Sequence, residues 1–165
     1  MSLKDCEMNN NLVLIDTSVW IFALSKNFLP EIKQRVDTLL KENRVAICSM
    51  VKLELLGGTR TKKEFERLKS RLDSLYEIKI NDNVWHKAAE MAFSLRRKGV
   101  TIPYTDILIS ASALSERALI LHADEHFNLI AKNFGLSIKS LIDVIKRSGL
   151  NKKERWGKQI QDSTL

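Results

Sequence analysis

The sequence predicts an α/β protein with three layers, in which helices cover both faces of a central, mainly parallel sheet of four to five strands. Short runs of Leu, Val and Ile, as in residues 12–16 and 119–122, are typical of strands that are buried on both faces. Segments with apolar residues at helical spacing separate these runs. Because crossovers join strands that alternate with helices, the strands form a parallel sheet between layers of helices.

Five runs predict the strands in chain order. The first two are strongly apolar, the third and fifth are short, and the fourth ends at a histidine. A parallel arrangement puts all of their carboxyl ends at one edge of the sheet, where ligands bind in proteins of this class. The runs are residues 12–16, 44–48, 76–80, 119–122 and 136–138.

The helices have recognisable starts. Thr17 or Ser18, Ser49 and Thr105 are expected as N-caps, and Pro30 suits a first helical turn. Several of the segments have one apolar and one charged face, as surface helices do. The expected helices are residues 17–24, 30–40, 49–56, 61–75, 81–98, 105–114, 124–134 and 140–147.

Length and composition indicate one globular domain. The chain has 165 residues, 44% hydrophobic and 28% charged, and its 6 Gly and 2 Pro argue against long linkers. We expect a polar N-terminal extension at residues 1–11, the domain at 12–147 and a basic, polar C-terminal tail at 148–165. The sequence shows neither a membrane-spanning stretch nor a signal peptide, and two cysteines, Cys6 and Cys48, favour a reducing compartment. A cytoplasmic location is therefore expected.

The charge balance favours an anionic partner. The chain has 27 Lys and Arg against 20 Asp and Glu, a net charge of +7, and nucleic acid is the simplest such partner. Residues 52–71 hold seven of the basic residues. The candidates for contacts with RNA phosphates are Arg60, Lys62 and Lys63. Glu54 lies on one predicted helix, and these residues lie at the start of the next. The alternative is that these residues are the solvated face of an amphipathic helix.

Four acids stand in or beside apolar segments. Asp16 directly follows the first strand, and Asp124 follows the fourth. Asp106 begins an apolar helix, and Glu54 lies inside one. Burying an unpaired charge costs several kcal/mol, so these positions require a partner. Taken singly, each Asp has an alternative role as a helix cap and Glu54 as a solvated residue, but the strand-end geometry predicts one group.

A cluster of carboxylates predicts a divalent cation. Carboxylates in close contact repel each other, and a hard cation removes that conflict. Oxygen ligands suit Mg²⁺ or Mn²⁺, and the sequence has no His–Cys cluster that would favour zinc. On a basic protein such a site suggests cleavage of a phosphodiester bond, because a bound metal ion lowers the pKa of water and makes it a nucleophile.

The motifs around these acids resemble the PIN-domain family of metal-dependent ribonucleases, and within it the VapC-type toxins of bacterial toxin–antitoxin pairs. The resemblance spans residues 12 to about 140 and lies in segments 13–19, 53–57, 105–111 and 122–127. It implies a PIN-like fold, an RNA substrate, a cognate antitoxin protein and a homodimer. It also implies that four acids are the catalytic residues and bind Mg²⁺ or Mn²⁺. These acids are Asp16, Glu54, Asp106 and Asp124.

The same resemblance assigns supporting residues. Thr17 or Ser18 is expected to lend a hydroxyl to the site, and Thr105 neighbours the third acid. The family often has a further Asp two residues after the fourth acid, where this chain has His126. We interpret His126 first as a helix cap, with metal binding and phosphate contact as alternatives. His86 and His122 are expected to be structural.

Two other classes of function fit parts of the pattern. One is a DNA-directed, flap-type nuclease, although the chain is short for additional DNA-binding elements. The other is a non-catalytic regulatory domain that binds Mg²⁺ or RNA. A receiver-like regulator has two adjacent acids after its first strand, whereas Thr17 and Ser18 follow Asp16 here.

Overall fold

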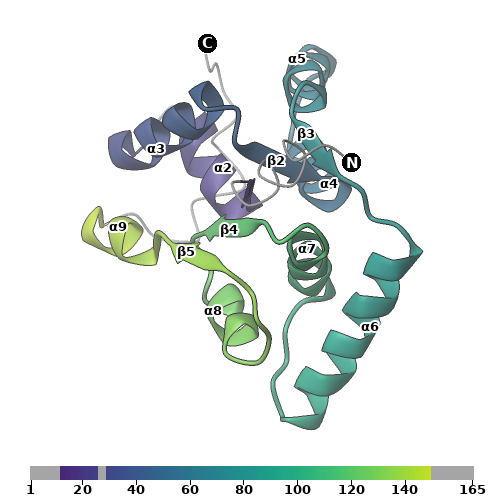
Figure 1. Ribbon diagram of the computed structural model, residues 1–165. Coiled ribbons are helices and arrows are strands. Elements are labelled where there is room, and N and C mark those ends of the chain that lie inside the picture. The colour runs from purple at the N-terminus through teal and green to yellow at the C-terminus, as the bar shows by residue number, and fades with distance from the viewer. Residues whose placement is uncertain (1–11, 26–28, 150–165) are drawn as a thin grey trace.

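The computed structural model describes residues 12–25 and 29–149, and Figure 1 shows the arrangement of their helices and strands. Within these ranges five strands form one sheet. The whole extension expected at residues 1–11, and the expected tail from residue 150 onward, lie outside the described residues. The strands are β1 (Val13–Ile15), β2 (Val45–Cys48), β3 (Tyr76–Ile78), β4 (Leu119–His122) and β5 (Ile138–Ser140).

The sheet is parallel throughout, with the strand order β3-β2-β1-β4-β5. The central strand β1 pairs with β2 through Val13 and Val45, and with β4 from Val13 opposite Leu119 to Ile15 opposite Leu121. The predicted three-layer α/β architecture is therefore confirmed.

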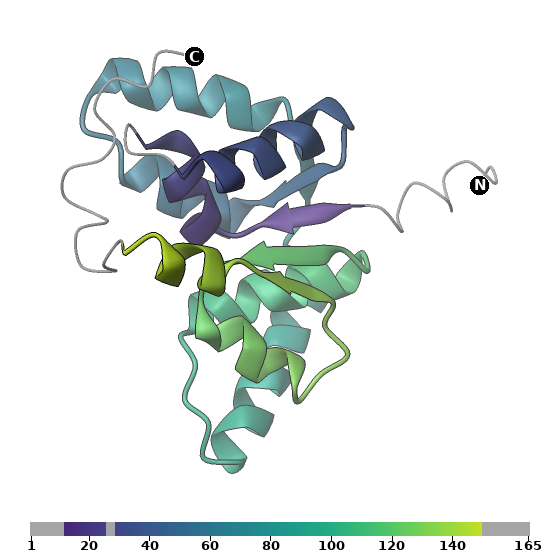
Figure 2. The ribbon, with the colours of Figure 1, turned by 90° about the vertical axis from the view of Figure 1, so that its left-hand side faces the viewer.

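Helices cover both faces of the sheet, and Figure 2 shows these layers from the side. The purple to blue helices α2 to α5 lie above the sheet in this view, and the teal to green helices α6 to α8 lie below it. Within the described ranges the helices are α2 (Thr17–Leu24), α3 (Pro30–Lys41), α4 (Ser49–Gly57), α5 (Lys62–Asp73), α6 (Asp82–Arg97), α7 (Tyr104–Ser115), α8 (Glu125–Ala131) and α9 (Ile142–Arg147).

The topology creates a switch point between β1 and β4. The chain moves from β1 to β2 on one side, whereas β4 and β5 extend the sheet on the other side. The helices that follow β1 and β4 therefore leave toward opposite faces, which opens a crevice beyond the carboxyl ends of these two strands. Any chemistry of this fold is expected there.

The core explains why the strands were recognisable in the sequence. All residues of β1 and β2 are buried, and in β4 only Leu119 is partly exposed. Buried side chains of α7, such as Ile107 and Ile109, belong to the same hydrophobic core. Among the described residues, no helix is both long and apolar enough to cross a membrane.

Some local expectations were wrong. The helix expected to start at Thr105 begins at Tyr104 with Pro103 as its N-cap, and Cys48 rather than Ser49 is the N-cap of α4. The fifth strand lies two residues later than expected, at Ile138–Ser140. It is an edge strand with exposed residues, so hydrophobicity does not mark it.

Candidate active site

Asp16 stands where β1 becomes α2. Its backbone N–H donates to the carbonyl of Leu121 on β4 at 3.0 Å, so the residue still belongs to the sheet edge. Its carboxylate accepts the backbone N–H of Ser18 at 2.9 Å and also the Ser18 hydroxyl. Asp16 is therefore the N-cap of α2, and it also lies at the switch point. The two interpretations of this acid are compatible.

Asp124 takes the corresponding position after β4. It is the N-cap of α8, and its carboxylate accepts the backbone N–H of His126 at 3.1 Å. The backbone N–H of the preceding Ala123 donates to the Ser18 hydroxyl oxygen at 3.0 Å. Ser18 thus connects the ends of β1 and β4, which holds the first and the fourth acid at one edge.

The other two acids come from helices that pack over this edge. Glu54 lies inside α4, and its carboxylate accepts a short hydrogen bond from the Thr17 hydroxyl. Asp106 lies in the first turn of α7, and one of its carboxylate oxygens is 2.8 Å from Nδ1 of His126. A separate element therefore supplies each acid.

The four acids line one hollow of about 150 Å³. The structure thus brings together all four residues that the sequence selected. Two further polar residues at its wall belong to the first turn of α2. The residues around the hollow are Asp16, Thr17, Ser18, Ile21, Glu54, Asp106 and Asp124.

The surroundings of the site disfavour the charged forms of two of its carboxyl groups. Burial, together with the smaller effect of the charges of Asp106 and Glu54, raises the pKa of Asp16 to about 7, although the two hydrogen bonds from Ser18 oppose the shift. Burial also raises the pKa of Asp106, although the contact with His126 opposes the shift. Carboxylates in this condition gain most from a nearby cation.

The donor set fits a hard divalent cation by its chemistry, since four carboxylates surround one small space. In the ranges that the structure describes, no three His, Cys, Asp or Glu side chains already surround one point as metal ligands would. All four carboxylates instead bind neighbours: Asp16 binds Ser18, Glu54 binds Thr17, and Asp106 and Asp124 both contact His126. Metal binding would therefore require these side chains to exchange hydrogen bonds for coordination.

The raised pKa of Asp16 predicts how the stability of the metal-free protein depends on pH. Between 3.8, the ordinary value, and about 7, the native state holds a proton that the unfolded state has lost. The free energy of unfolding therefore falls as the pH rises through this window. Urea denaturation in EDTA at pH 5 and at pH 8 measures this change. Between these two pH values the free energy of unfolding of wild type should fall more than that of Asp16→Asn, by up to a few kcal/mol. Equal falls in the two proteins would contradict this prediction.

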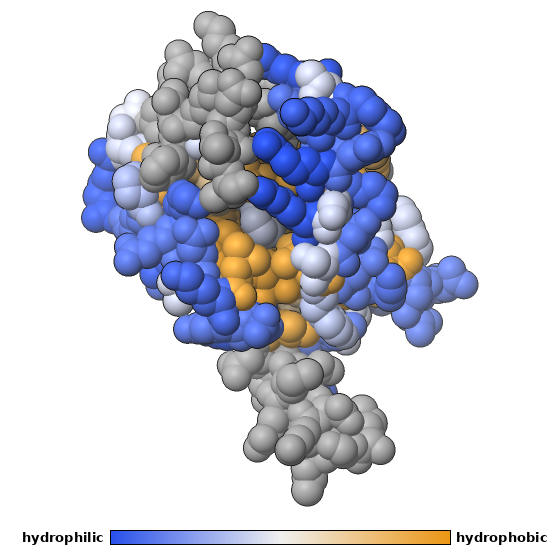
Figure 3. All heavy atoms as spheres, turned by 90° about the horizontal axis from the view of Figure 1, so that it is seen from above, coloured by the Kyte–Doolittle hydropathy of each residue, from blue (hydrophilic) through white to orange (hydrophobic). Residues whose placement is uncertain are grey.

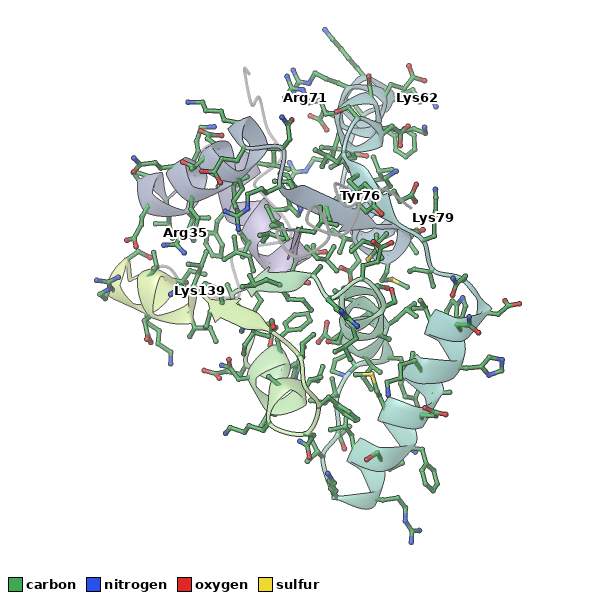
Figure 4. All side chains as sticks on the ribbon, in the orientation of Figure 1. Arg35, Lys62, Arg71, Tyr76, Lys79 and Lys139 are labelled. Atoms are coloured by element: carbon green, nitrogen blue, oxygen red, sulfur yellow. The ribbon has the colours of Figure 1, made fainter. Side chains whose placement is uncertain are left out.

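The remaining predicted residues lie around the hollow or away from it. Thr105 precedes Asp106 in α7, but it is not among the described residues that line the hollow. Arg60, Lys62 and Lys63 are exposed near the start of α5 and do not line it either. Lys62 lies 3.2 Å from Glu66, and Figure 4 shows Lys62 on the outer side of α5. Their contact with RNA stays a prediction.

Sequence reasoning missed two features of the site. Ile21 lines the hollow. It lies one helical turn after Thr17 and Ser18, and this spacing could have predicted that it faces the same way. The contact between His126 and Asp106 had no local signal, because it depends on how α8 packs against α7. His122 is structural as expected: it is buried and packs on the Phe127 ring with centroids 5.2 Å apart. Burial lowers the pKa of His122.

The fold and this hollow together define a class. Residues 13–133 match the PIN domain family, and the chain belongs to this family. Of the curated proteins, Ribonuclease VapC11 of Mycobacterium tuberculosis is 29% identical over 134 residues, which cover 78% of this chain and 98% of that protein. Ribonuclease VapC2 of Rickettsia felis is 29% identical over 133 residues and 98% of its own length, or 74% of this chain.

Solved structures agree with this assignment. VapBC2 from Rickettsia felis, bound to a DNA fragment from its promoter, superposes with a TM-score of 0.63 at 26% identity, over 78% of this chain and 98% of that chain. DNA-bound VapBC from Salmonella typhimurium shows the same fold, with a TM-score of 0.64 at 21% identity, over 78% and 97% of the two chains.

Proposed function

We propose that this protein is a metal-dependent endoribonuclease and the toxin of a toxin–antitoxin pair. One observation carries the proposal: acids from four separate elements line a single hollow at the switch point of the sheet. The similar proteins named as VapC ribonucleases support RNA as the substrate. A cytoplasmic location accompanies this proposal, since the substrate would be cellular RNA.

The chain's own residues would hold and orient the reacting groups. Asp16, Glu54, Asp106 and Asp124 would bind Mg²⁺ or Mn²⁺, which supplies a water of lowered pKa and stabilises the charge that develops on the phosphate. The chemistry that the bound ion would supply is a nucleophilic water for hydrolysis of an RNA phosphodiester bond. Thr17 and Ser18 would keep the carboxylates of Glu54 and Asp16 in position through their hydroxyls.

Incubation of the full-length protein with total RNA tests this function. We expect cleavage in Mn²⁺ or Mg²⁺, loss of cleavage in EDTA and recovery when either ion is added in excess. Single-stranded and flapped DNA in parallel reactions should stay intact. Cleavage that persists in EDTA, or that prefers flapped DNA, would contradict the proposal.

A protein partner is proposed for the helical face that Figure 3 shows. An orange apolar strip runs between the blue flanks formed by α3 and α5. Partly buried apolar residues of this layer include Leu39, Leu56 and Leu68. The solved VapBC complexes support an antitoxin as the occupant, because each contains a protein of this fold with its antitoxin. An apolar segment of the antitoxin would suit the strip.

We further propose that two copies of the chain associate through an exposed aromatic face formed by α6 and the start of α7. Trp85, Phe93 and Tyr104 are 56%, 69% and 67% exposed and surround a hollow of about 450 Å³ between α6 and α7. The first turn of α6 holds Asp82 and its last turn holds two arginines. In an antiparallel pair of α6 helices, the acidic start of each copy would meet the basic end of the other.

Phe93→Glu should therefore weaken self-association. A charge in the centre of an apolar interface is expected to raise the dimer Kd roughly 30-fold or more, about 2 kcal/mol. Sedimentation equilibrium measures this change. Leu40→Glu on α3, another exposed apolar position, is the matched control and should leave the Kd unchanged. A wild-type monomer, or an unchanged Kd for Phe93→Glu, would contradict the proposed face.

A further inference from the structure

His126 occupies a position between two of the acids. Its Nδ1 lies 2.8 Å from one oxygen of Asp106 and 3.3 Å from one oxygen of Asp124. The first acid belongs to α7 and the second precedes α8, so the ring joins side chains from two elements. The side chain is 36% exposed, and solvent therefore reaches it.

The cap of α8 does not need this ring. The hydrogen bond that caps the helix runs from the backbone N–H of His126 to the carboxylate of Asp124, and any residue except proline supplies that donor. The imidazole is not buried in the core either. The contacts that the structure gives to the ring are those with the carboxylates of Asp106 and Asp124.

Both separations are hydrogen-bond or ion-pair distances, and they also place Nδ1 as close to each carboxylate as two adjacent ligands of one ion lie. Two ligand atoms at right angles, each about 2.1 Å from an octahedral ion, lie about 3.0 Å apart. The Nδ1–oxygen distances of 2.8 and 3.3 Å bracket this value. A neutral imidazole carries its proton on either nitrogen, so Nδ1 presents a lone pair when the proton is on Nε2.

We propose that His126 Nδ1 is a ligand of the divalent cation held by Asp106 and Asp124, and that it shifts the preference of the site from Mg²⁺ toward Mn²⁺. This inference rests on the proposed function. Mg²⁺ is a hard ion that prefers oxygen and keeps its waters, whereas transition metals accept imidazole nitrogen more readily. In place of the carboxylate that the family often has here, His126 removes one negative charge and adds one nitrogen donor.

Pulsed electron paramagnetic resonance of the full-length protein with one equivalent of Mn²⁺ tests the ligand directly. Wild type should show the echo modulation of a directly bound ¹⁴N, and His126→Asp should not. His86→Asn is the control, since His86 is an exposed histidine on α6, and it should leave the modulation unchanged. Calorimetric titrations with Mn²⁺ and Mg²⁺ should show that His126→Asp lowers the ratio of the two affinities roughly tenfold.

The outcomes separate this inference from the proposed function. If Mn²⁺ binds to wild type but not to Asp16→Asn, and the ¹⁴N modulation is absent, the role of His126 is overturned and the acid site stands. An unchanged ratio of Mn²⁺ to Mg²⁺ affinity in a folded His126→Asp protein also overturns it. If wild type binds no Mn²⁺ at all, both proposals fail. The electron paramagnetic resonance measurement on wild type does not depend on whether any variant folds.

Discussion

Asp16→Asn is expected to lower the rate of RNA cleavage a hundredfold or more. Changes in residues that only orient metal ligands cost about 10–100-fold, and loss of a ligand costs at least as much. An amide keeps an oxygen that accepts the hydrogen bonds from Ser18, so the cap of α2 should survive. The variant also lacks a buried charge, and the metal-free protein should be at least as stable as wild type.

The cleavage assay uses a labelled RNA with Mn²⁺ in excess, and circular dichroism in EDTA gives the thermal midpoint of each variant. Asp106→Asn should lose activity in the same way. Asp37→Asn is the matched control, because Asp37 lies on α3 away from the hollow and pairs with Lys33 at 3.4 Å. Full activity of either site variant would overturn the proposed role of the acids.

Phe127→Ala is expected to lower the free energy of unfolding by about 3–5 kcal/mol, the usual cost of removing a fully buried ring. Phe127 is buried in the first half of α8, where it packs on His122. The same helix begins directly after Asp124. Loss of this packing should therefore loosen the fourth acid as well and weaken Mn²⁺ binding.

Urea denaturation in EDTA measures the change in stability, and calorimetry at a temperature where the variant is folded measures the affinity for Mn²⁺. Leu129→Ala in the same helix is the control, since this side chain is exposed and its loss should cost about 0.5 kcal/mol or less. A similar loss in both variants would show that α8 is not anchored through Phe127.

The sequence was most informative where burial is complete. Strands β1, β2 and β4 were recognisable because nearly every residue in them is apolar and buried, as expected in the middle of a parallel sheet. The edge strand β5 was misplaced, since Lys139 and Ser140 are exposed while Leu136 is buried outside the strand. Hydrophobicity reports burial rather than backbone pairing, and the two differ at the edge of a sheet.

The acids of the hollow were predictable from topology. Asp16 and Asp124 follow strands that pair with each other, so their proximity follows from one parallel sheet. The bonds from Thr17 to Glu54 and between His126 and Asp106 join residues 37 and 20 positions apart, and they depend on how the helices pack. Such contacts have no local sequence pattern, and only the three-dimensional structure reveals them.

The most direct test of the central claim is a crystal of the full-length protein soaked in Mn²⁺ and measured at a wavelength where manganese scatters anomalously. We predict a strong anomalous peak in the hollow, within coordination distance of carboxylates from Asp16, Asp106 and Asp124, and we predict that Asp16→Asn abolishes this peak. A peak bound elsewhere, or an empty hollow in a protein that still cleaves RNA, would contradict the central claim.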